Sequence, residues 1–390
     1  MKRIKTTWDD FWMKHRLLRT LRGTLRVAAC LLSFCLTALL LFSMVMSAGE
    51  STASLLPGSG AGNVKERFDM HLTNLLSDAL EGVHKIEKVY WLSDTDPVAP
   101  APNPDCFGET TDPAVLKQVL ADAAELLEGQ SLYFDPDRPL VPGSTVQYYL
   151  DDTIFSIVWK EAHHACVYTF CETKIAHPSQ FRRFLAGDAY GTAQQFLTTE
   201  MSESVNAVTA ASGDFYGYRK IGTVVYRGEI CREDNALDLC MVDDKGDLHF
   251  LYAGEAPQGE ALQQYIEDNN IRFNIAFGPV LVDNGVLREN EDYPVGEIIY
   301  YFSRAALCQM DSLHYLVATA NKEKGYPVFP NLAEFAQVIA ATGAPMAYTL
   351  DGGQTATITI DDQLVNQVSY GSQRRISDII YFATALPDGG

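Results

Sequence analysis

An uninterrupted apolar segment near the N-terminus constrains this 390-residue chain more than any other feature. Residues 27–48, VAACLLSFCLTALLLFSMVMSA, contain no charged side chain. As a helix rising about 1.5 Å per residue, this segment would measure roughly 33 Å, enough to cross the hydrocarbon core of a bilayer. The alternative is a cleaved signal peptide, for which both the apolar stretch and the basic region before it are long. The pattern therefore favours an uncleaved transmembrane anchor.

The charges on either side of this segment predict its orientation. Residues 1–26 hold eight Lys or Arg and two Asp, whereas Gly49 and Glu50 follow the segment. Membrane proteins retain their positive flank on the cytoplasmic side. Residues 1–26 are thus expected to be a cytoplasmic basic tail. The protein is expected to be a single-pass signal-anchor protein of the cell membrane and cell envelope, with the membrane as partner through residues 27–48 and its C-terminal domain extracytoplasmic.

Net charge and cysteine spacing limit the other partners. The chain carries −20, to which residues 1–26 contribute +6, so −26 falls on the rest. Such an acidic body repels nucleic acid, and no nucleic-acid partner is expected. No Cys or His cluster has zinc spacing, so no metal ligand is predicted, and the sequence leaves any cofactor unknown. Cys231 and Cys240 flank a predicted hairpin; a disulfide between them is the alternative to packed free thiols.

Between the anchor and the main domain, residues 49–143 are interpreted as a linker and helical stalk region. Residues 49–61 are small and polar, and residues 62–92 place apolar side chains three or four positions apart, as in an amphipathic helix. That helix would pack on the domain or on a second copy of itself, which makes self-association through residues 62–92 a hypothesis. Asp112 is expected to cap a short helix that reaches about Leu127.

Beyond about Ser144 the sequence changes to runs of β-branched and aromatic residues typical of strands. Helices are predicted at about 178–187, 257–268 and 331–343, and strands elsewhere. Because strands and helices are mixed without strict βαβ alternation, residues 144–385 are predicted to form one α+β domain built on a single mixed sheet.

Four segments of this domain place glycine or a charge at the end of an apolar run: SGDFYGYR (212–219), AFGPVLVDNG (276–285), SRAALCQMDSLHYLVATA (303–320) and AYTLDGGQTATI (347–358). In this order and spacing they resemble the phosphodiester glycosidase family, which includes the uncovering enzyme, an N-acetylglucosamine-1-phosphodiester alpha-N-acetylglucosaminidase, and exopolysaccharide-related bacterial members. The resemblance covers about residues 144–385 and is most specific in the GDFY and LDGG blocks.

The resemblance implies a site made from these blocks. Asp351 and Asp214 match acidic positions of the family's motifs and are the candidate catalytic residues. The positions implied to bind substrate are Gly213, Arg304, Gly352, Gly353, Gln354, Thr355 and either Arg374 or Arg375.

The chemistry of such a family fits these residue types. Sugar transfer from a phosphodiester passes through an oxocarbenium-like state, which a carboxylate stabilises or attacks. Arginine binds phosphate through paired N–H donors, and consecutive amides of a Gly-Gly turn form an anion site. We therefore expect Asp351, Gly352, Gly353, Asp214 and Arg304 to converge on one pocket, with the turn amides and the Thr355 hydroxyl facing it.

Four departures from the family pattern leave two functions open. Ser212 stands where the family commonly has Asn, Gln354-Thr355 replaces Gly-Ser, Cys308 replaces a glycine, and Ala320–Lys322 falls where the family often has an Asp-Gly-Arg-like turn. One hypothesis is a membrane-anchored extracytoplasmic hydrolase that cleaves a sugar from a sugar-1-phosphodiester of a cell-surface glycan. The other is a catalytically inactive glycan-binding or cell-envelope scaffold module on the same fold. Either would take a glycan or sugar phosphate as partner.

Overall fold

A computed structural model describes residues 90–93, 96–290, 293 and 300–387. The chain divides into two units, Met1–Glu87 and Lys88–Gly390, and all described residues belong to the second. The predicted basic tail, the apolar segment 27–48 and the stalk helix up to residue 89 therefore lie outside the described residues. Among those that are described, no helix combines the length and apolar character needed to cross a membrane.

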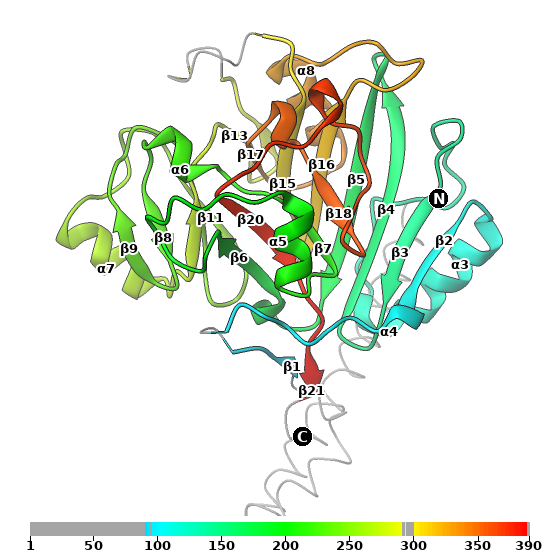
Figure 1. The fold of residues 1–390 in the computed structure, drawn as a ribbon, viewed down its shortest axis with the longest axis horizontal. Coiled ribbons are helices and arrows are strands. Elements are labelled where there is room, and N and C mark those ends of the chain that lie inside the picture. The colour runs from blue at the N-terminus through cyan, green and yellow to red at the C-terminus, as the bar shows by residue number, and fades with distance from the viewer. Residues whose placement is uncertain (1–89, 94–95, 291–292, 294–299, 388–390) are drawn as a thin grey trace, which may run out of the picture. The chain divides into compact units, whose positions relative to one another are not determined.

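A nine-stranded sheet runs through the described unit (Figure 1). Its longest strands, β4 (Ile154–His163) and β5 (Cys166–Ile175), form a hairpin rich in β-branched and aromatic residues, and β5 is buried along its whole length. In order across the sheet the strands are β14 (Val286–Leu287), β13 (Val280–Asp283), β17 (Met346–Leu350), β15 (Arg304–Asp311), β16 (His314–Asn321), β5, β4, β3 (Val146–Leu150) and β2 (Phe107–Thr110).

Two five-stranded sheets share an apolar core with one face of the large sheet, as side chains from all three sheets join a single buried cluster. The first has the order β19 (Gln363–Leu364), β18 (Ile358–Ile360), β7 (Thr209–Ser212), β20 (Asp378–Phe382) and β6 (Phe181–Leu185). The second has the order β11 (Leu248–Leu251), β10 (Leu239–Val242), β12 (Phe273–Ile275), β8 (Val224–Tyr226) and β9 (Glu229–Arg232), and β1 (Tyr90–Trp91) pairs with β21 (Leu386–Pro387) separately.

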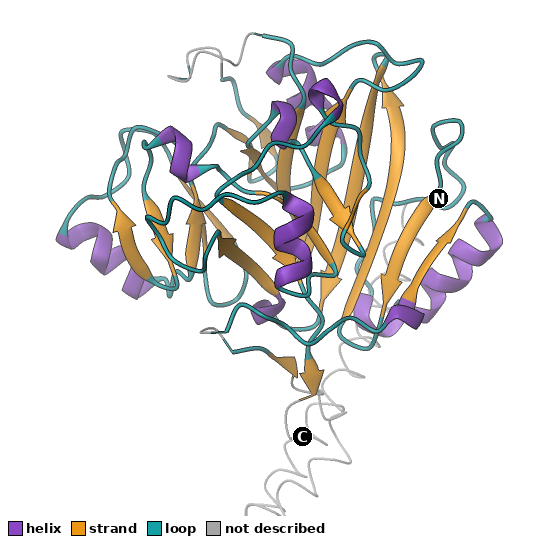
Figure 2. Cartoon of the chain, in the orientation of Figure 1, coloured by secondary structure: helices purple, strands orange, loops and turns teal. Residues whose placement is uncertain are grey.

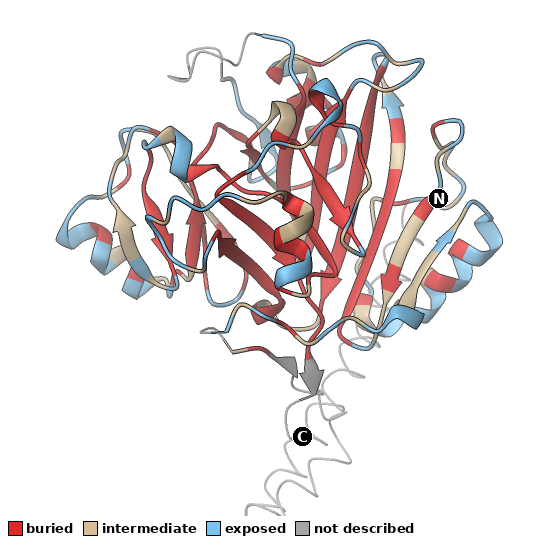
Figure 3. Ribbon diagram, viewed as in Figure 1, coloured by how far each residue is buried: buried red, intermediate tan, exposed pale blue. Residues whose placement is uncertain are grey.

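Helices cover the opposite face of the large sheet, where α3 (Pro113–Asp122), α4 (Ala124–Leu127) and α8 (Leu332–Ala341) contribute to a second buried cluster. The predicted cap is confirmed, as the Asp112 carboxylate accepts from the Ala114 amide at 2.9 Å. Figures 2 and 3 show the few helices around the buried strands. The remaining helices are α5 (Thr198–Ser204), α6 (Tyr216–Arg219) and α7 (Glu260–Asp268), with 3-10 turns η1 (Pro104–Cys106), η2 (Pro178–Gln180), η3 (Gly353–Thr355) and η4 (Ser369–Gly371).

The structure corrects two predictions of secondary structure. Every strand pair of the described residues is antiparallel, so the domain contains several antiparallel sheets and not one mixed sheet. Residues 178–187 form the turn η2 and strand β6, not a helix. Arg182 and Arg183 are both buried there, and each has buried partners that a solvent-facing helix surface could not provide.

The described part of residues 49–143 joins this unit. Strand β2 pairs with β3, and α3 and α4 pack in the second buried cluster, on the helix-covered face of the large sheet.

Cys231 and Cys240 stand on strands that do not pair, and the six cysteines of the described residues are free thiols.

Candidate active site

Antiparallel pairing brings three charged residues to one end of the nine-stranded sheet. Ala305 lies opposite Leu350 on β17, so Arg304 at the start of β15 lies beside Asp351, which follows β17 directly. Arg304 also pairs with Ala320, which places Lys322 just past the end of β16. These charges are remote in sequence but neighbours in space, because β15 begins at the edge of the sheet where β16 and β17 end.

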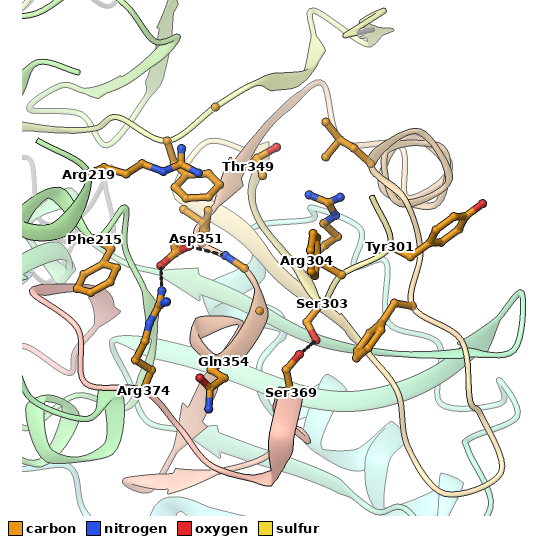
Figure 4. Close-up of a pocket in the computed structure, with 18 of the residues that line it drawn as sticks. Phe215, Arg219, Tyr301, Ser303, Arg304, Thr349, Asp351, Gln354, Ser369 and Arg374 are labelled. Carbon is orange, nitrogen blue, oxygen red and sulfur yellow. Dashed lines mark hydrogen bonds and ion pairs between the residues drawn. The ribbon is translucent and has the colours of Figure 1, made fainter. Parts of the chain in front are cut away.

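These residues open into a cavity of about 560 Å³, within the range of small-molecule sites (Figure 4). Residues of α6, the β12–β13 turn, the start of α8 and η4 also line this cavity. Its described lining carries one carboxylate and four cations, a positive balance inside an acidic chain. The carboxylate is Asp351, and the cations are Arg219, Arg304, Lys322 and Arg374.

Asp351 is held in place from two directions. Its Oδ2 accepts from Arg374 Nη2 at 3.0 Å, and its Oδ1 accepts from the Gly352 amide at 2.9 Å. The residue is 8% exposed. Burial raises the pKa of Asp351 from 3.8 to about 6, opposed by the Thr355 hydroxyl and by Arg374 and Arg219. A carboxylate with such a pKa, facing a cavity, is the kind of group that active sites use.

The two glycines after Asp351 allow the chain to cross from the large sheet into the turn η3. A Cβ on Gly352 would lie 2.5 Å from the Ser303 carbonyl oxygen, and Gly353 adopts a positive φ of 68°. The Gly353 amide donates to that same carbonyl at 2.9 Å. The expectation that the turn amides bind an anion is therefore wrong for Gly352 and Gly353, because both donate within the protein. Binding of an anion is left to the cationic side chains.

Aromatic rings support the four cations. The Arg374 guanidinium lies 4.6 Å from the centre of the Phe215 ring, Arg219 lies 3.9 Å from that of Phe277, and Lys322 Nζ lies 4.3 Å from that of Phe329. The buried Arg304 lies 5.9 Å from the centre of the Phe302 ring and donates to the Tyr300 carbonyl at 2.6 Å. Stacking against rings fixes the direction of these flexible side chains, so the cavity's charge is positioned before any ligand arrives.

Asp214, the second predicted catalytic residue, does not line the cavity. Its Oδ1 accepts from Arg183 Nη2 and from the Tyr216 amide, both at 2.8 Å, and its Oδ2 accepts from the Ala276 amide at 2.7 Å. Both Asp214 and Arg183 have 0% exposed side chains, and Arg183 also pairs with Asp378 at 2.8 Å. This buried cluster of one arginine and two carboxylates fixes the turn before α6. Asp214 is therefore a structural residue beside the site.

Gly213 and Thr355 also have structural roles. A Cβ on Gly213 would lie 1.9 Å from Asp378 Oδ2, so the glycine admits that carboxylate to the turn. Its carbonyl accepts from the Asp351 amide at 3.1 Å, which joins the two predicted blocks through their backbone. The Thr355 hydroxyl donates to the Gly352 carbonyl and is buried.

The choice between the two consecutive arginines is resolved by position. Arg374 lines the cavity, whereas Arg375 is exposed and pairs with Glu200 at 2.9 Å through both of its terminal nitrogens. Gln354 lines the cavity and donates to the Ser372 carbonyl at 3.2 Å. The predicted residues that meet at the cavity are Asp351, Gly352, Gly353, Gln354, Arg304 and Arg374.

Sequence reasoning missed Arg219 and Lys322. Arg219 is the last residue of α6, directly after the GDFY block that sequence analysis singled out. Lys322 lies in the segment that departs from the family pattern, yet its side chain supplies a cation to the cavity wall. In the described residues, no group of three or more His, Cys, Asp or Glu could hold a metal ion.

Comparison with known proteins agrees with the motifs. Residues 205–383, which include every cavity-lining residue named so far, match the family model described as phosphodiester glycosidase. This part of the chain therefore matches a phosphodiester glycosidase domain. The domain thus contains Asp351, the four cations, and the buried Asp214 and Asp378; Arg183 lies before the matched range. No curated protein sequence matches the chain.

Solved structures of other proteins show a loose likeness. The zebrafish N-acetylglucosamine-1-phosphodiester alpha-N-acetylglucosaminidase catalytic domain, auto-inhibited by its pro-peptide, is 16% identical with a TM-score of 0.48, over 65% of this chain and 87% of that one. A hypothetical protein from Synechocystis is 14% identical with a TM-score of 0.49, over 63% and 64% of the two chains.

Proposed function

We propose that this protein is an extracytoplasmic hydrolase, anchored in the membrane by residues 27–48, that releases a sugar from a sugar-1-phosphodiester of a cell-surface glycan. One observation carries the proposal: in a phosphodiester glycosidase domain, Asp351 stands among four cations in one cavity. The arrangement matches the two charges of such a reaction, positive at the anomeric carbon and negative on the departing phosphate.

The proposed reaction breaks the bond between the anomeric carbon and the phosphate oxygen. The bond's electron pair goes to that oxygen, and a water oxygen bonds to the carbon. One water proton stays on the sugar hydroxyl and the other passes to the phosphate monoester. Asp351, as a carboxylate, stabilises the positive charge that develops on the sugar. A phosphate monoester is a good leaving group, so a single lining carboxylate suffices.

Arg374 links the two halves of this site. Its Nη2 donates to Asp351 at 3.0 Å, and its guanidinium rests on Phe215, so its direction is fixed. A guanidinium has five N–H donors, which allows one group to hold the carboxylate and also to meet phosphate oxygens. Figure 4 shows Arg304 on the other side of Asp351 from Arg374, as expected for a phosphodiester held from two sides.

The direct test is sugar release by the full-length protein in detergent micelles from a panel of methyl sugar-1-phosphodiesters that differ in the sugar. The proposal expects free sugar and methyl phosphate from at least one member. No release from any hexose or N-acetylhexosamine diester, by a protein shown to be folded, would contradict it.

One observation favours the inactive glycan-binding alternative: Asp214, the second carboxylate of the predicted pair, is turned away into a buried cluster. A module that only binds would keep the cations and tolerate the loss of a catalytic carboxylate. Binding of the same diesters without any release of sugar would support this alternative.

The pKa of Asp351 predicts the pH dependence of the reaction. The ionised carboxylate is the active form, and burial raises its pKa to about 6. Because the phosphodiester stays ionised in this range, kcat/KM should rise with pH and reach half its maximum near pH 6. Rates on a methyl sugar-1-phosphodiester between about pH 5 and pH 8 would measure this. A flat profile would mean that the ionisation of Asp351 does not control the reaction.

The proposed anchor makes a topological prediction. With an epitope tag before residue 1, protease added to intact cells, or to spheroplasts where an outer layer shields the protein, should digest residues 144–390. It should spare residues 1–26, because the basic tail is expected on the cytoplasmic side. Protection of the domain together with loss of the tag would reverse the proposed orientation.

A further inference from the structure

Exposed aromatic side chains gather at the mouth of the cavity. Among the described residues, six aromatic side chains are exposed, and four of these line the cavity. The exposed fractions reach 91% for Tyr370 and 71% for Tyr218. We call the four that line the cavity the aromatic rim: Tyr218, Tyr301, Phe302 and Tyr370. Large rings left in water around a single opening indicate a binding surface.

The rim comes from three separate segments. Tyr218 lies on α6, Tyr301 and Phe302 precede β15, and Tyr370 lies in η4. In Figure 4, Tyr301 stands on the Arg304 side of Asp351, opposite Phe215 and Arg374. Tyr218 belongs to the latter side, because its ring stacks on Phe215 with centres 5.2 Å apart and planes at 8°. The rings therefore flank the carboxylate on two sides.

Tyr370 is held in an unfavourable backbone conformation. Its φ of 61° lies in the left-handed region, which an aromatic residue adopts at a cost. The ring is almost entirely in water, so it adds little packing to the fold. Strain retained beside a candidate site is a mark of function when the outlier itself is observed.

The charge of the cavity adds a second argument. One phosphodiester carries a single negative charge, whereas four cations and one carboxylate line the described wall. Arg304 and Arg374 flank Asp351, where the scissile phosphodiester is proposed to lie, so Lys322 is a further cation of the described wall. A further cation beside that position favours a ligand with more than one phosphate. Sugar rings present C–H faces that pack on aromatic rings, and three of the four rim residues add a hydroxyl.

We propose that the aromatic rim forms sugar-binding subsites on both sides of Asp351, and that the ligand is a chain of several sugars joined by phosphodiesters. This inference rests on the proposed function for the position of the scissile bond. The rim supplies stacking surfaces for neighbouring sugars, and Lys322, held over the Phe329 ring, meets an adjacent phosphodiester. The ligand is therefore longer than one sugar-1-phosphodiester.

Two probes test the proposal: methyl N-acetylglucosamine 1-phosphodiester, and a tetramer of N-acetylglucosamine joined from C1 to C6 by phosphodiesters. Their affinities are measured by calorimetry on the full-length protein in detergent micelles. The wild type should bind the tetramer more tightly. Tyr370→Ala and Tyr218→Ala should each reduce that preference about fivefold, the range of a lost ring contact. Tyr370→Trp should restore it.

A matched control is Tyr190→Ala, which removes an exposed ring that stacks on Tyr216 away from the cavity lining. It should leave the preference unchanged. Equal losses for both probes, no loss for either, or a wild type that does not prefer the tetramer would overturn the proposal. Release of sugar is recorded in parallel. Rim-dependent binding without release would refute the hydrolase alone, whereas release without rim dependence would refute the subsites alone.

Discussion

Asp351→Asn is expected to abolish sugar release, with a loss of at least about a thousandfold in kcat/KM, while the protein stays folded. The substitution keeps the size of the side chain and removes the charge that faces the developing positive charge on the sugar. It also removes the carboxylate that holds Arg374 at 3.0 Å. Initial rates on a confirmed methyl sugar-1-phosphodiester measure the loss, and circular dichroism reports the fold.

The same variant should gain stability relative to the wild type as pH rises. The raised pKa of Asp351, about 6 in the fold against 3.8 for the free group, means that ionising it inside the protein costs stability as pH rises through about 6. Asparagine has no such cost. The difference in unfolding free energy should shift by about 1 kcal/mol in favour of the variant between about pH 5 and pH 8.

Measuring both the rate and the stability of Asp351→Asn distinguishes a catalytic residue from a turn residue. If Asp351 served only the turn, its replacement would change stability but leave the rate on a confirmed substrate near the wild-type value. Urea unfolding at the two pH values, set beside the rates, distinguishes these outcomes. Full activity in the variant would remove Asp351 from the site.

Arg183→Leu is expected to destabilise the domain by about 3–5 kcal/mol, because it leaves Asp214 and Asp378 buried without their cation. Burial raises the pKa of the Asp214 carboxyl, which the Arg183 guanidinium opposes. The loss of the arginine would force protonation of buried carboxyls or open the turn before α6. The thermal midpoint and the urea unfolding curve measure this effect.

Arg375→Leu is the matched control. It also removes an arginine that holds a carboxylate, that of Glu200, but this pair is exposed to solvent. Screening by water makes such pairs weak, so its thermal midpoint should stay close to that of the wild type. If both variants unfold alike, or neither is affected, the buried cluster does not support the site. Where Arg183→Leu does not fold, Arg183→Lys keeps the charge and gives a measurable intermediate.

The sequence predicted the residues of the cavity better than the architecture around it. Asp351 and Arg304 could be expected to meet because both lie in segments that resemble the site motifs of one family. The structure adds the reason, since β15 and β17 are antiparallel neighbours and bring the two residues to one edge of the sheet. The sequence could not show that Asp351 faces the cavity whereas Asp214 faces away from it. Both are acids beside glycines, and only the distant partner Arg183, in a segment predicted as a helix, turns Asp214 inward.

The other differences between the predicted and the observed site also arise from tertiary packing. The Gly352 and Gly353 amides looked available for an anion because their acceptors, a neighbouring side chain and the Ser303 carbonyl, are set by tertiary packing. Lys322 lies in a segment that departs from the family motif, yet its side chain lines the cavity. Local patterns identify the chemistry of a residue, and the fold decides which way it faces.

The bond cleaved beside Asp351 is expected to be the one between the anomeric carbon and its oxygen. Hydrolysis of methyl N-acetylglucosamine 1-phosphodiester, or of whichever diester the panel identifies, in ¹⁸O-labelled water tests it by mass spectrometry of the phosphate product. We expect methyl phosphate without ¹⁸O, formed by the wild type and lost in Asp351→Asn. Methyl phosphate that contains ¹⁸O, or sugar 1-phosphate with methanol, would show cleavage at phosphorus and contradict it.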